Sequence, residues 1–541
     1  MQVRRLTALA VLPVVIAGGV AACSGGNKSS GNSTDSSKTV VSVGIGEPKS
    51  IIPPNAGETE GGQVIYATFA GLLDYDKDSK PFPVIADSIT TQDSKVWTIK
   101  IKDGFTFHNG EKVTSESFID AWNWGAYGPN ASDVNSYYQQ IDGYAAMNPT
   151  DSKATPTAKT LSGLKKVDDL TFTVTLSSPF VDFNAELGYT AFYPMPKVAF
   201  TPDGTVTKAY EDAPIGDGPF KIKGKWNHDQ NIETERFDGW KGTKVKVAGI
   251  NFKIYQDQKA QYSDTLADTL DIDRKVDTSN LINAKNDFGN RYKVSALSEF
   301  QYLAFPTYDP KYSNPDVRKA ISMAIDRQQI ADTIFAGTVK PATSFISPVI
   351  PGFRDNTCGD ACKFNAAAAK ALYQSAGGPA TIQITYNADG GHKPSIEAVC
   401  NQLQTNLGVT CQAKGEPKFA DLLAKVKAKD PTVGMFRLGW VMDYPSMYDY
   451  LFPLYDTASI PSPNYFGYSN KQFDDLVQKG TEAKTQADAI KLWQQAEDIL
   501  AKDMPVIPMR YGQNNYVTSK KIKNVDVTLF SWVNPYTVEA S

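Results

Sequence analysis

Alternating apolar and polar positions predict several β-strands along the chain. Residues 39–45 alternate as strands do, and residues 381–386 follow the same pattern. Residues 96–107 alternate on both sides of an Asp-Gly pair, which predicts a β-hairpin with its turn at that pair. Residues 167–176 predict one further strand.

Apolar residues at helical spacing predict helices among these strands. The first runs from Thr114 to Trp124, with Thr114 as its N-cap and Ser117 where a full capping box has Glu or Gln. Residues 315–337 predict a single long helix. Further helices are expected at 394–406, 419–428, 473–479 and 487–502, and further strands at 432–440 and from 506 to 510. This alternation without internal repeats predicts an α/β fold with sheets covered by helices.

The first 22 residues have the pattern of a secretory signal peptide. Arg4 and Arg5 precede the apolar run 6–16, and small residues follow up to Cys23. The apolar run is shorter than the roughly 20 residues that a helix needs to cross a bilayer. We therefore expect residues 1–22 to be cleaved rather than to span a membrane.

Val20-Ala21-Ala22-Cys23 resembles a lipobox, and this predicts a lipid-modified Cys23 that anchors the protein to the outer face of a membrane. The alternative is an ordinary secretory signal in which Cys23 is incidental. Residues 24–38 contain no large apolar side chain, so the segment 23–38 is expected to be the lipidated cysteine and a flexible tether.

Length and charge limit what the rest of the chain can be. A body of about 500 residues is too long for one core and predicts two or three lobes. The formal net charge of −4 at pH 7 is mildly acidic and shows no basic cluster. This balance argues against nucleic acid as a partner.

The four cysteines that follow Cys23 fall into two close pairs. Three disulfide connectivities are possible, and the pairing of Cys358 with Cys362 and of Cys400 with Cys411 closes the shortest loops. A zinc site is the rival interpretation, but the spacings are irregular and no histidine is placed as a fourth ligand. We expect no metal site.

Catalytic signatures are missing from the sequence. The three histidines, His108, His228 and His392, are far apart, and no zinc-protease, nucleophile-elbow or P-loop motif occurs. Gly216-Asp217-Gly218 lacks the third glycine of a dinucleotide site and predicts a tight turn. The sequence therefore predicts no enzyme and no cofactor.

The clearest polar and aromatic cluster is residues 439–445, where a strand ending in Trp440 leads into an Asp-Tyr-Pro turn. Such a turn can place a carboxylate beside an aromatic surface from which water is excluded. Taken alone, however, Asp443 is more typical of a solvated turn acid.

Several longer motifs occur in an order that resembles family 5 of the ABC importer solute-binding proteins, the dipeptide and oligopeptide binders. The most specific is the stretch 97–114, which ends in a Phe-His-x-Gly segment and the start of a helix. The others are 214–222, 316–327, Asn464 with Phe466, Tyr468 and Phe473-Asp474, and 503–508. In this resemblance His108 is a structural residue, and Asp326-Arg327 is expected to be a helix-end ion pair.

The resemblance implies a fold of the type II periplasmic-binding-protein kind, a three-lobed clam shell with hinge strands. Lobe I would combine residues 39–75, 195–295 and 506–541. Lobe II would be inserted at 76–194, and lobe III would cover 296–505. These boundaries rest on the resemblance alone.

The resemblance also implies a site. Asp443 would pair with a peptide's α-ammonium and Arg437 would meet its carboxylate, while Gly439 and Trp440 would supply a backbone edge and a wall. Tyr444, and Glu58 with Thr59 from a facing segment, complete the expected ligand contacts.

The implied function is an extracytoplasmic, lipid-anchored, monomeric binding protein that delivers short peptides to membrane permease subunits of an ABC importer. One alternative is a family member for another small solute, such as an oligosaccharide, glutathione or a metal chelate. A secreted hydrolase is the alternative from another class, and the missing catalytic motifs disfavour it.

Overall fold

The protein is described here by a computed structural model in which residues 36–149 and 154–541 are placed. The expected signal peptide, Cys23 and nearly all of the expected tether lie outside these residues. Among the helices of the placed residues, none combines the length and apolar character needed to cross a bilayer.

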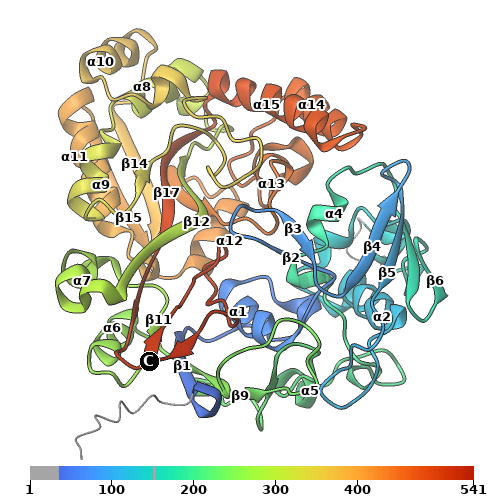
Figure 1. Ribbon diagram of the computed structural model, residues 1–541. Coiled ribbons are helices and arrows are strands. Elements are labelled where there is room, and N and C mark those ends of the chain that lie inside the picture. The colour runs from blue at the N-terminus through green and yellow to red at the C-terminus, as the bar shows by residue number, and fades with distance from the viewer. Residues whose placement is uncertain (1–35, 150–153) are drawn as a thin grey trace, which may run out of the picture. The chain divides into compact units, whose positions relative to one another are not determined.

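Two long antiparallel strands run through the middle of the largest sheet and join its two halves (Figure 1). These are β12 (Tyr292–Ala304) and β17 (Val506–Thr518), whose pairing shifts register between Ala296 and Phe300. On one side β17 pairs with β11 (Ile272–Asp273), and on the other β12 pairs with β16 (Met435–Trp440). The two halves of the sheet are therefore connected through these two strands.

Within the described ranges this sheet has eleven strands in the order β15-β14-β16-β12-β17-β11-β1-β10-β9-β8, with β13 added to β17. Its remaining strands are β1 (Val40–Ile45), β8 (Phe220–Ile222), β9 (Asn231–Arg236), β10 (Gly249–Ile254), β13 (Lys340–Pro341), β14 (Thr381–Asn387) and β15 (Thr410–Glu416). β1 is parallel to both of its neighbours, β10 and β11, which buries it in the middle of one half.

A separate sheet of four strands lies in the region expected to form lobe II. Its order is β4-β5-β7-β6, from β4 (Ala86–Thr91), β5 (Val96–Ile101), β6 (Leu164–Asp168) and β7 (Thr171–Thr175). Two small ribbons pair β2 (Leu73–Tyr75) with β3 (Pro81–Pro83) and β18 (Ile522–Lys523) with β19 (Glu539–Ala540).

Helices pack around these sheets, as the alternating pattern predicts (Figure 1). In the first half of the chain they are α1 (Thr59–Thr68), α2 (Ser115–Ala126), α3 (Tyr144–Met147), α4 (Phe183–Glu186), α5 (Lys208–Asp212), α6 (Gln258–Leu266) and α7 (Leu281–Phe288). The second half has α8 (Pro315–Met323), α9 (Arg327–Ile334), α10 (Ala366–Ser375), α11 (Lys393–Leu407), α12 (Phe419–Lys427), α13 (Tyr448–Tyr455), α14 (Lys471–Thr481) and α15 (Gln486–Asp503).

The hydrophobic core divides in the same way as the large sheet. One cluster packs α8, α9 and α11 against β14, with Ile321, Val399 and Ile384 buried in it. Another surrounds β1 and β10, with Val43 and Phe252 fully buried. Each half of the sheet therefore has its own hydrophobic core.

The predicted hairpin at 96–107 is wrong in its turn. β5 ends at Ile101 and pairs with β4 and β7 rather than with the segment that follows it. Phe105 and Phe107 are both buried, and their backbone pairs instead with residues 111–113 across a turn at Asn109-Gly110. The alternating residues do form β-structure, but residues 96–101 pair with β4 and β7, whereas residues 105–107 pair with residues 111–113.

Two other predicted elements are each split in two. Residues 167–176 contain the turn between β6 and β7, so they are not one strand. The expected long helix at 315–337 breaks after Met323 into α8 and α9, because Asp326 accepts a hydrogen bond from the Gln329 N–H and caps a new helix.

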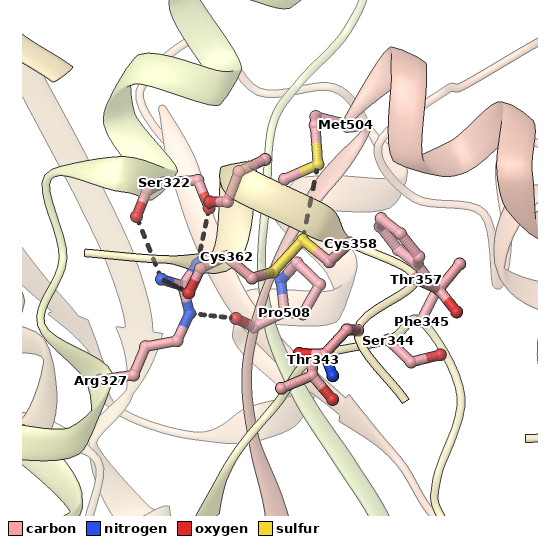
Figure 2. Close-up of a disulfide and its surroundings, with 12 residues drawn as sticks. Ser322, Arg327, Thr343, Ser344, Phe345, Thr357, Cys358, Cys362, Met504 and Pro508 are labelled. Atoms are coloured by element: carbon pink, nitrogen blue, oxygen red, sulfur yellow. Dashed lines mark hydrogen bonds between the residues drawn. A yellow bond between two sulfur atoms is a disulfide. The ribbon is translucent and has the colours of Figure 1, made fainter. Parts of the chain in front are cut away.

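Arg327 does not form the expected ion pair with Asp326 within the described residues. Its side chain is buried and donates to the carbonyl oxygens of Ser322 and Pro508, at 3.1 and 2.6 Å. That expectation is wrong because the carboxylate of Asp326 is used for the cap and the guanidinium points into the protein (Figure 2).

Both disulfides join neighbouring cysteines, Cys358 to Cys362 and Cys400 to Cys411. Figure 2 shows the first beside Met504, whose Sδ lies 4.0 Å from the Sγ of Cys358. Of the three connectivities open to the sequence, the structure has the local one.

His108 holds the segment 216–218 in place. Its Nδ1 accepts from the Gly216 N–H at 3.2 Å, and its Nε2 lies 3.1 Å from the Gly218 carbonyl oxygen, so a neutral ring with the proton on Nε2 satisfies both bonds. Burial lowers the pKa of His108 to about 4, which keeps the ring neutral. The predicted tight turn is not formed: residues 216–218 instead pack closely against the end of α1, where a Cβ on Gly216 would lie 1.9 Å from the Thr68 carbonyl oxygen.

Candidate functional site

Strand β16 has an open edge over its last residues. On one side, Arg437 to Trp440 pair with β12 in an unbroken ladder. On the other side, the pairing with β14 covers only Met435 and Phe436, and no other strand of the described ranges pairs there. The backbone from Arg437 to Trp440 is therefore available to pair with an extended ligand.

The turn that follows this edge is held by a buried carboxylate. Asp449, in the first turn of α13, accepts hydrogen bonds from the Asp443 N–H at 3.0 Å and from the indole N–H of Trp440 at 3.3 Å. Asp449 is only 3% exposed. It fixes both the end of the strand and the position of Asp443.

The side chain of Asp443 points to a pair of tyrosines from the expected lobe II. The hydroxyl of Tyr137 donates to the Asp443 carboxylate, and the Tyr189 hydroxyl also bonds to it. The two tyrosine rings pack with their centroids 4.7 Å apart. Asp443 is therefore not the freely solvated turn acid that its local sequence suggests.

These groups line a cavity of about 260 Å³. One wall is Trp440 to Asp443, and the facing wall is the segment from Ala56 to Thr59. The remaining lining comes from Tyr137, Tyr189, Thr190, Phe530 and Trp532. Segments far apart in the sequence thus build one crevice beside the open edge of β16.

Three buried carboxylates gather behind Asp443, which is itself half-buried. Asp449, Glu186 and Asp182 are each 2–3% exposed, and one oxygen of Glu186 and one of Asp182 lack hydrogen-bond partners. No basic side chain in the described part of the chain forms an ion pair with any of the four. The group is also not arranged around a common metal position, because the described residues contain no such arrangement.

Burial raises the pKa of each of these carboxyls. The pKa of Asp182 rises to about 6, and burial with the charges of Asp182 and Asp443 raises that of Glu186 well above its usual range. Burial also raises the pKa values of Asp443 and Asp449, and the charge of Asp443 adds to the effect on Asp449. The cluster is short of positive charge, so a cation bound beside Asp443 would be stabilised strongly.

Arg437 lies on the opposite face of β16 from Trp440, because successive side chains of a strand alternate. It lines a small cavity of about 40 Å³ together with His392 and Arg510. Its guanidinium donates to Gln301 and, at 3.4 Å, to Asn387. The structure therefore separates Arg437 from the crevice around Asp443.

This basic cluster contains its own counter-ion. Arg510 bonds to Glu299 at 2.9 Å, and Gln301 donates to the same carboxylate at 2.7 Å. Burial favours the protonated form of Glu299, but the positive charges of Arg510, Arg437 and Lys275 outweigh it and lower its pKa. Burial and the same positive charges lower the pKa of His392 to about 2, so it stays neutral.

Of the other expected ligand contacts, Glu58 and Thr59 line the cavity, and each also has a structural contact. Glu58 caps α1 by accepting from the Gly61 N–H at 2.8 Å and from the Glu60 N–H at 2.6 Å, so its carboxylate is occupied. Thr59 lines the crevice, and its carbonyl oxygen accepts from the Trp532 indole. Gly439 lies under Gln301, where a Cβ would come within 2.5 Å of that side chain. Tyr444 is buried and does not line the cavity.

Sequence reasoning did not find Tyr137, Tyr189, Asp449 or Glu186. The contact between Tyr137 and Asp443 joins positions 306 residues apart, and nothing in either local pattern indicates it. Only Asp449 has a sequence feature that could have indicated its role. It is an acidic residue in the first turn of a helix, and such residues often accept hydrogen bonds from nearby N–H groups.

Comparison with known proteins places this site in context. Residues 80–462 match the sequence profile described as "Bacterial extracellular solute-binding proteins, family 5 Middle". The chain is 26% identical over 517 residues to the oligopeptide-binding protein OppA of Bacillus subtilis (strain 168), covering 92% of each chain.

Two solved structures share the fold. The murein tripeptide binding protein MppA of Escherichia coli superposes with a TM-score of 0.78 at 22% identity, covering 93% of this chain and 98% of that one. Haemophilus influenzae OppA in complex with RPPGFSPFR gives a TM-score of 0.76 at 21% identity, with 93% and 99% covered. These likenesses confirm the type II periplasmic-binding-protein fold. Because the profile covers most of the chain, the protein belongs to family 5 of the bacterial extracellular solute-binding proteins.

Proposed function

We propose that the protein is the substrate-binding component of an ABC importer, which captures short peptides in the crevice at Asp443 and delivers them to a membrane permease without breaking a bond. The observation that carries this proposal is the buried carboxylate cluster, which lacks a positive charge and lies beside the open edge of β16. A peptide supplies both missing partners, because it has a terminal ammonium group and a backbone that can extend a sheet.

The names of the relatives support this class of ligand. The B. subtilis relative is an oligopeptide-binding protein, the E. coli neighbour is a murein tripeptide binding protein, and the H. influenzae neighbour was solved with a peptide. We carry the peptide class to this chain because its own residues offer the matching chemistry.

The geometry suggests how a peptide would lie. Its ammonium group would bond to Asp443, and its backbone would pair with Arg437 to Trp440. Asp443 lies six positions after Arg437, a separation of at most roughly 20 Å, so a ligand that reaches both ends has at most about six residues. The rings of Trp440, Tyr137 and Tyr189 would enclose the first side chain.

Closure of the crevice would use the expected lobes. Tyr137 and Tyr189 belong to the segment 76–194 that we assign to lobe II, whereas Asp443 belongs to lobe III at 296–505. Lobe I would combine residues 39–75, 195–295 and 506–541, and β12 with β17 would be the strands about which the lobes move. We further propose that the chain acts as a monomer held at the outer face of the membrane by lipid on Cys23.

Native mass spectrometry of the protein purified from a peptide-rich medium tests this function. We expect peptides of two to about six residues to be released on denaturation, and we expect the Asp443→Asn variant to be purified empty. The matched control is Asp456→Asn, which changes a buried aspartate outside the crevice and should retain peptides. A wild-type protein that carries a glycan or a metal chelate instead would overturn the peptide assignment.

A further inference from the structure

A second and larger cavity, of about 640 Å³, lies on the other side of the residues that close the peptide crevice. Its walls come from the ribbon β2-β3, from the loop at Trp240 and from the C-terminal segment 526–536. It lies within the range of about 300–1,000 Å³ that is typical of small-molecule sites. The crevice at Asp443 and this chamber share only Phe530 and Trp532.

The shared wall is a firmly held turn. Thr528 N–H donates to the Trp532 carbonyl oxygen at 2.7 Å, and Ser531 adopts a positive φ of 64° at the tip. Arg274 donates to the Ser531 carbonyl oxygen at 2.9 Å, and the Trp532 indole donates to Thr59 at 3.0 Å. These bonds hold Phe530 and Trp532 in place as the wall that the crevice and the chamber share.

Aromatic rings make up much of the chamber's surface. Tyr66, Tyr75, Phe105, Trp240, Phe530 and Trp532 all line it. The rings support one another in pairs: Tyr66 with Trp532 at 5.4 Å, Tyr75 with Phe530 at 5.6 Å and Phe105 with Trp240 at 5.7 Å between centroids. A surface of this kind attracts cations, because the ring faces carry negative charge.

One carboxylate lies among these rings without a counter-ion. Asp74 accepts hydrogen bonds from the Tyr66 hydroxyl at 3.0 Å and from the Tyr75 N–H at 2.7 Å. No basic side chain of the described residues forms an ion pair with it. Burial raises its pKa to about 6, so it carries a negative charge at neutral pH.

The basic residues at the chamber do not neutralise Asp74. Lys102 donates to the Val84 carbonyl oxygen at 2.7 Å, and Lys77 pairs with the exposed Asp78 at 2.9 Å. Lys241 is exposed at the rim. Asp76 and Asp526 are exposed as well, so Asp74 is the acid that the aromatic rings enclose.

We propose that this chamber is a second ligand site and that it binds an organic cation, an alkylammonium or guanidinium group held between the aromatic rings and the carboxylate of Asp74. The cation can come from a free small molecule or from a basic side chain of a bound peptide. In either case the chemistry of recognition is the same, and it does not depend on Asp443.

Calorimetric titration at pH 7.5 with choline and with its neutral isostere 3,3-dimethyl-1-butanol tests the cation preference. We expect choline to bind at least tenfold more tightly than the alcohol, and Asp74→Asn to abolish that difference while the protein unfolds at the same temperature. The matched control is Asp526→Asn, which removes the same charge from the exposed rim and should leave choline binding within twofold. Trp240→Leu should weaken choline binding while leaving Asp74 in place.

A second arm identifies the source of the cation. Tetrapeptides that contain lysine are compared with counterparts that contain norleucine, on the wild type and on Asp74→Asn. A lysine preference that disappears in Asp74→Asn supports the proposal with a peptide side chain as the source, and choline binding alone supports it with a free cation. The proposal is overturned if choline and the alcohol bind alike and no lysine preference depends on Asp74.

The peptide proposal at Asp443 and the cation proposal at Asp74 can each be wrong without the other being wrong. If peptides with neutral side chains still bind to Asp74→Asn, the peptide crevice is intact whatever becomes of the chamber. If no peptide binds to the wild type, choline titration still tests the chamber.

Discussion

The two ends of β16 carry charge in different ways. At the turn after Trp440, Asp443 and three buried carboxylates lie together, none of them in an ion pair with a basic side chain of the described residues, and two of them have an unpartnered oxygen. Near Arg437 a carboxylate is present, because Glu299 forms an ion pair with Arg510 and is linked through Gln301 to Arg437. The first end lacks a cation that a ligand can supply, whereas the second already contains one carboxylate among its guanidinium groups.

The difference indicates where a ligand gains most of its free energy. A charge that is buried without a partner is costly, so pairing it on binding releases that cost. A cluster with its own counter-ion gains less from a ligand's carboxylate, because the existing pairs must be rearranged. We therefore expect the ammonium end of a peptide to dominate its affinity.

The largest expected effect is that of Asp443→Asn. We expect peptide affinity to fall roughly a hundredfold, because a buried ammonium group would lose its charged partner. Isothermal titration calorimetry checks this value, with Asp456→Asn as the control that removes a buried carboxylate away from the crevice. If Asp443→Asn and Asp456→Asn bind the peptide with equal affinity, the ammonium end does not dominate peptide binding.

A smaller effect on stability is expected from Asp182→Asn. The pKa of Asp182 is raised to about 6 in the folded protein, so its stabilising contribution is complete below about pH 4 and is lost as pH rises through 6. At pH 8 the variant should be more stable than the wild type by about 3 kcal/mol, and at pH 4 the two should be alike. Urea unfolding at both pH values measures this difference.

The control for that experiment is Asp103→Asn, because Asp103 is exposed. It should change the free energy of unfolding by no more than about 0.5 kcal/mol at either pH. A wild type as stable as Asp182→Asn at pH 8 would mean that the carboxylate cluster is not short of positive charge.

The smallest effect is expected from Arg437→Gln. Glu299 keeps Arg510 as its partner, and the amide can still bond to Gln301, so peptide affinity should fall only about three- to tenfold. Titration with the same peptide as for Asp443→Asn gives the comparison directly. A loss as large as that of Asp443→Asn would show that the two ends contribute equally.

Much of the fold could be predicted from the sequence because its signals are local. The strands at β1 and β14 and the helices at α11, α14 and α15 follow from alternation and helical spacing. Family membership followed from motifs in order and is confirmed by the profile match. The errors came where a pattern crosses a boundary, as at 167–176, where alternation continues through the turn between β6 and β7.

The site was less predictable because distant segments build it. Asp443 could be singled out from its motif, but its partner Tyr137 and the carboxylates of Glu186 and Asp182 come from the other half of the chain. Glu58 was expected to meet the ligand, and the structure uses its carboxylate to cap α1. A single sequence does not indicate which residues meet across a crevice.

We infer that the carboxylate cluster at Asp443 binds a ligand's ammonium group. The most direct measurement is calorimetric titration of the wild type and Asp443→Asn with tri-alanine, with a free and with an acetylated N-terminus. We expect acetylation to weaken binding to the wild type at least a hundredfold and to change binding to Asp443→Asn by less than about threefold. If both peptides bind equally well to the wild type, Asp443 does not recognise an ammonium group and the account is wrong.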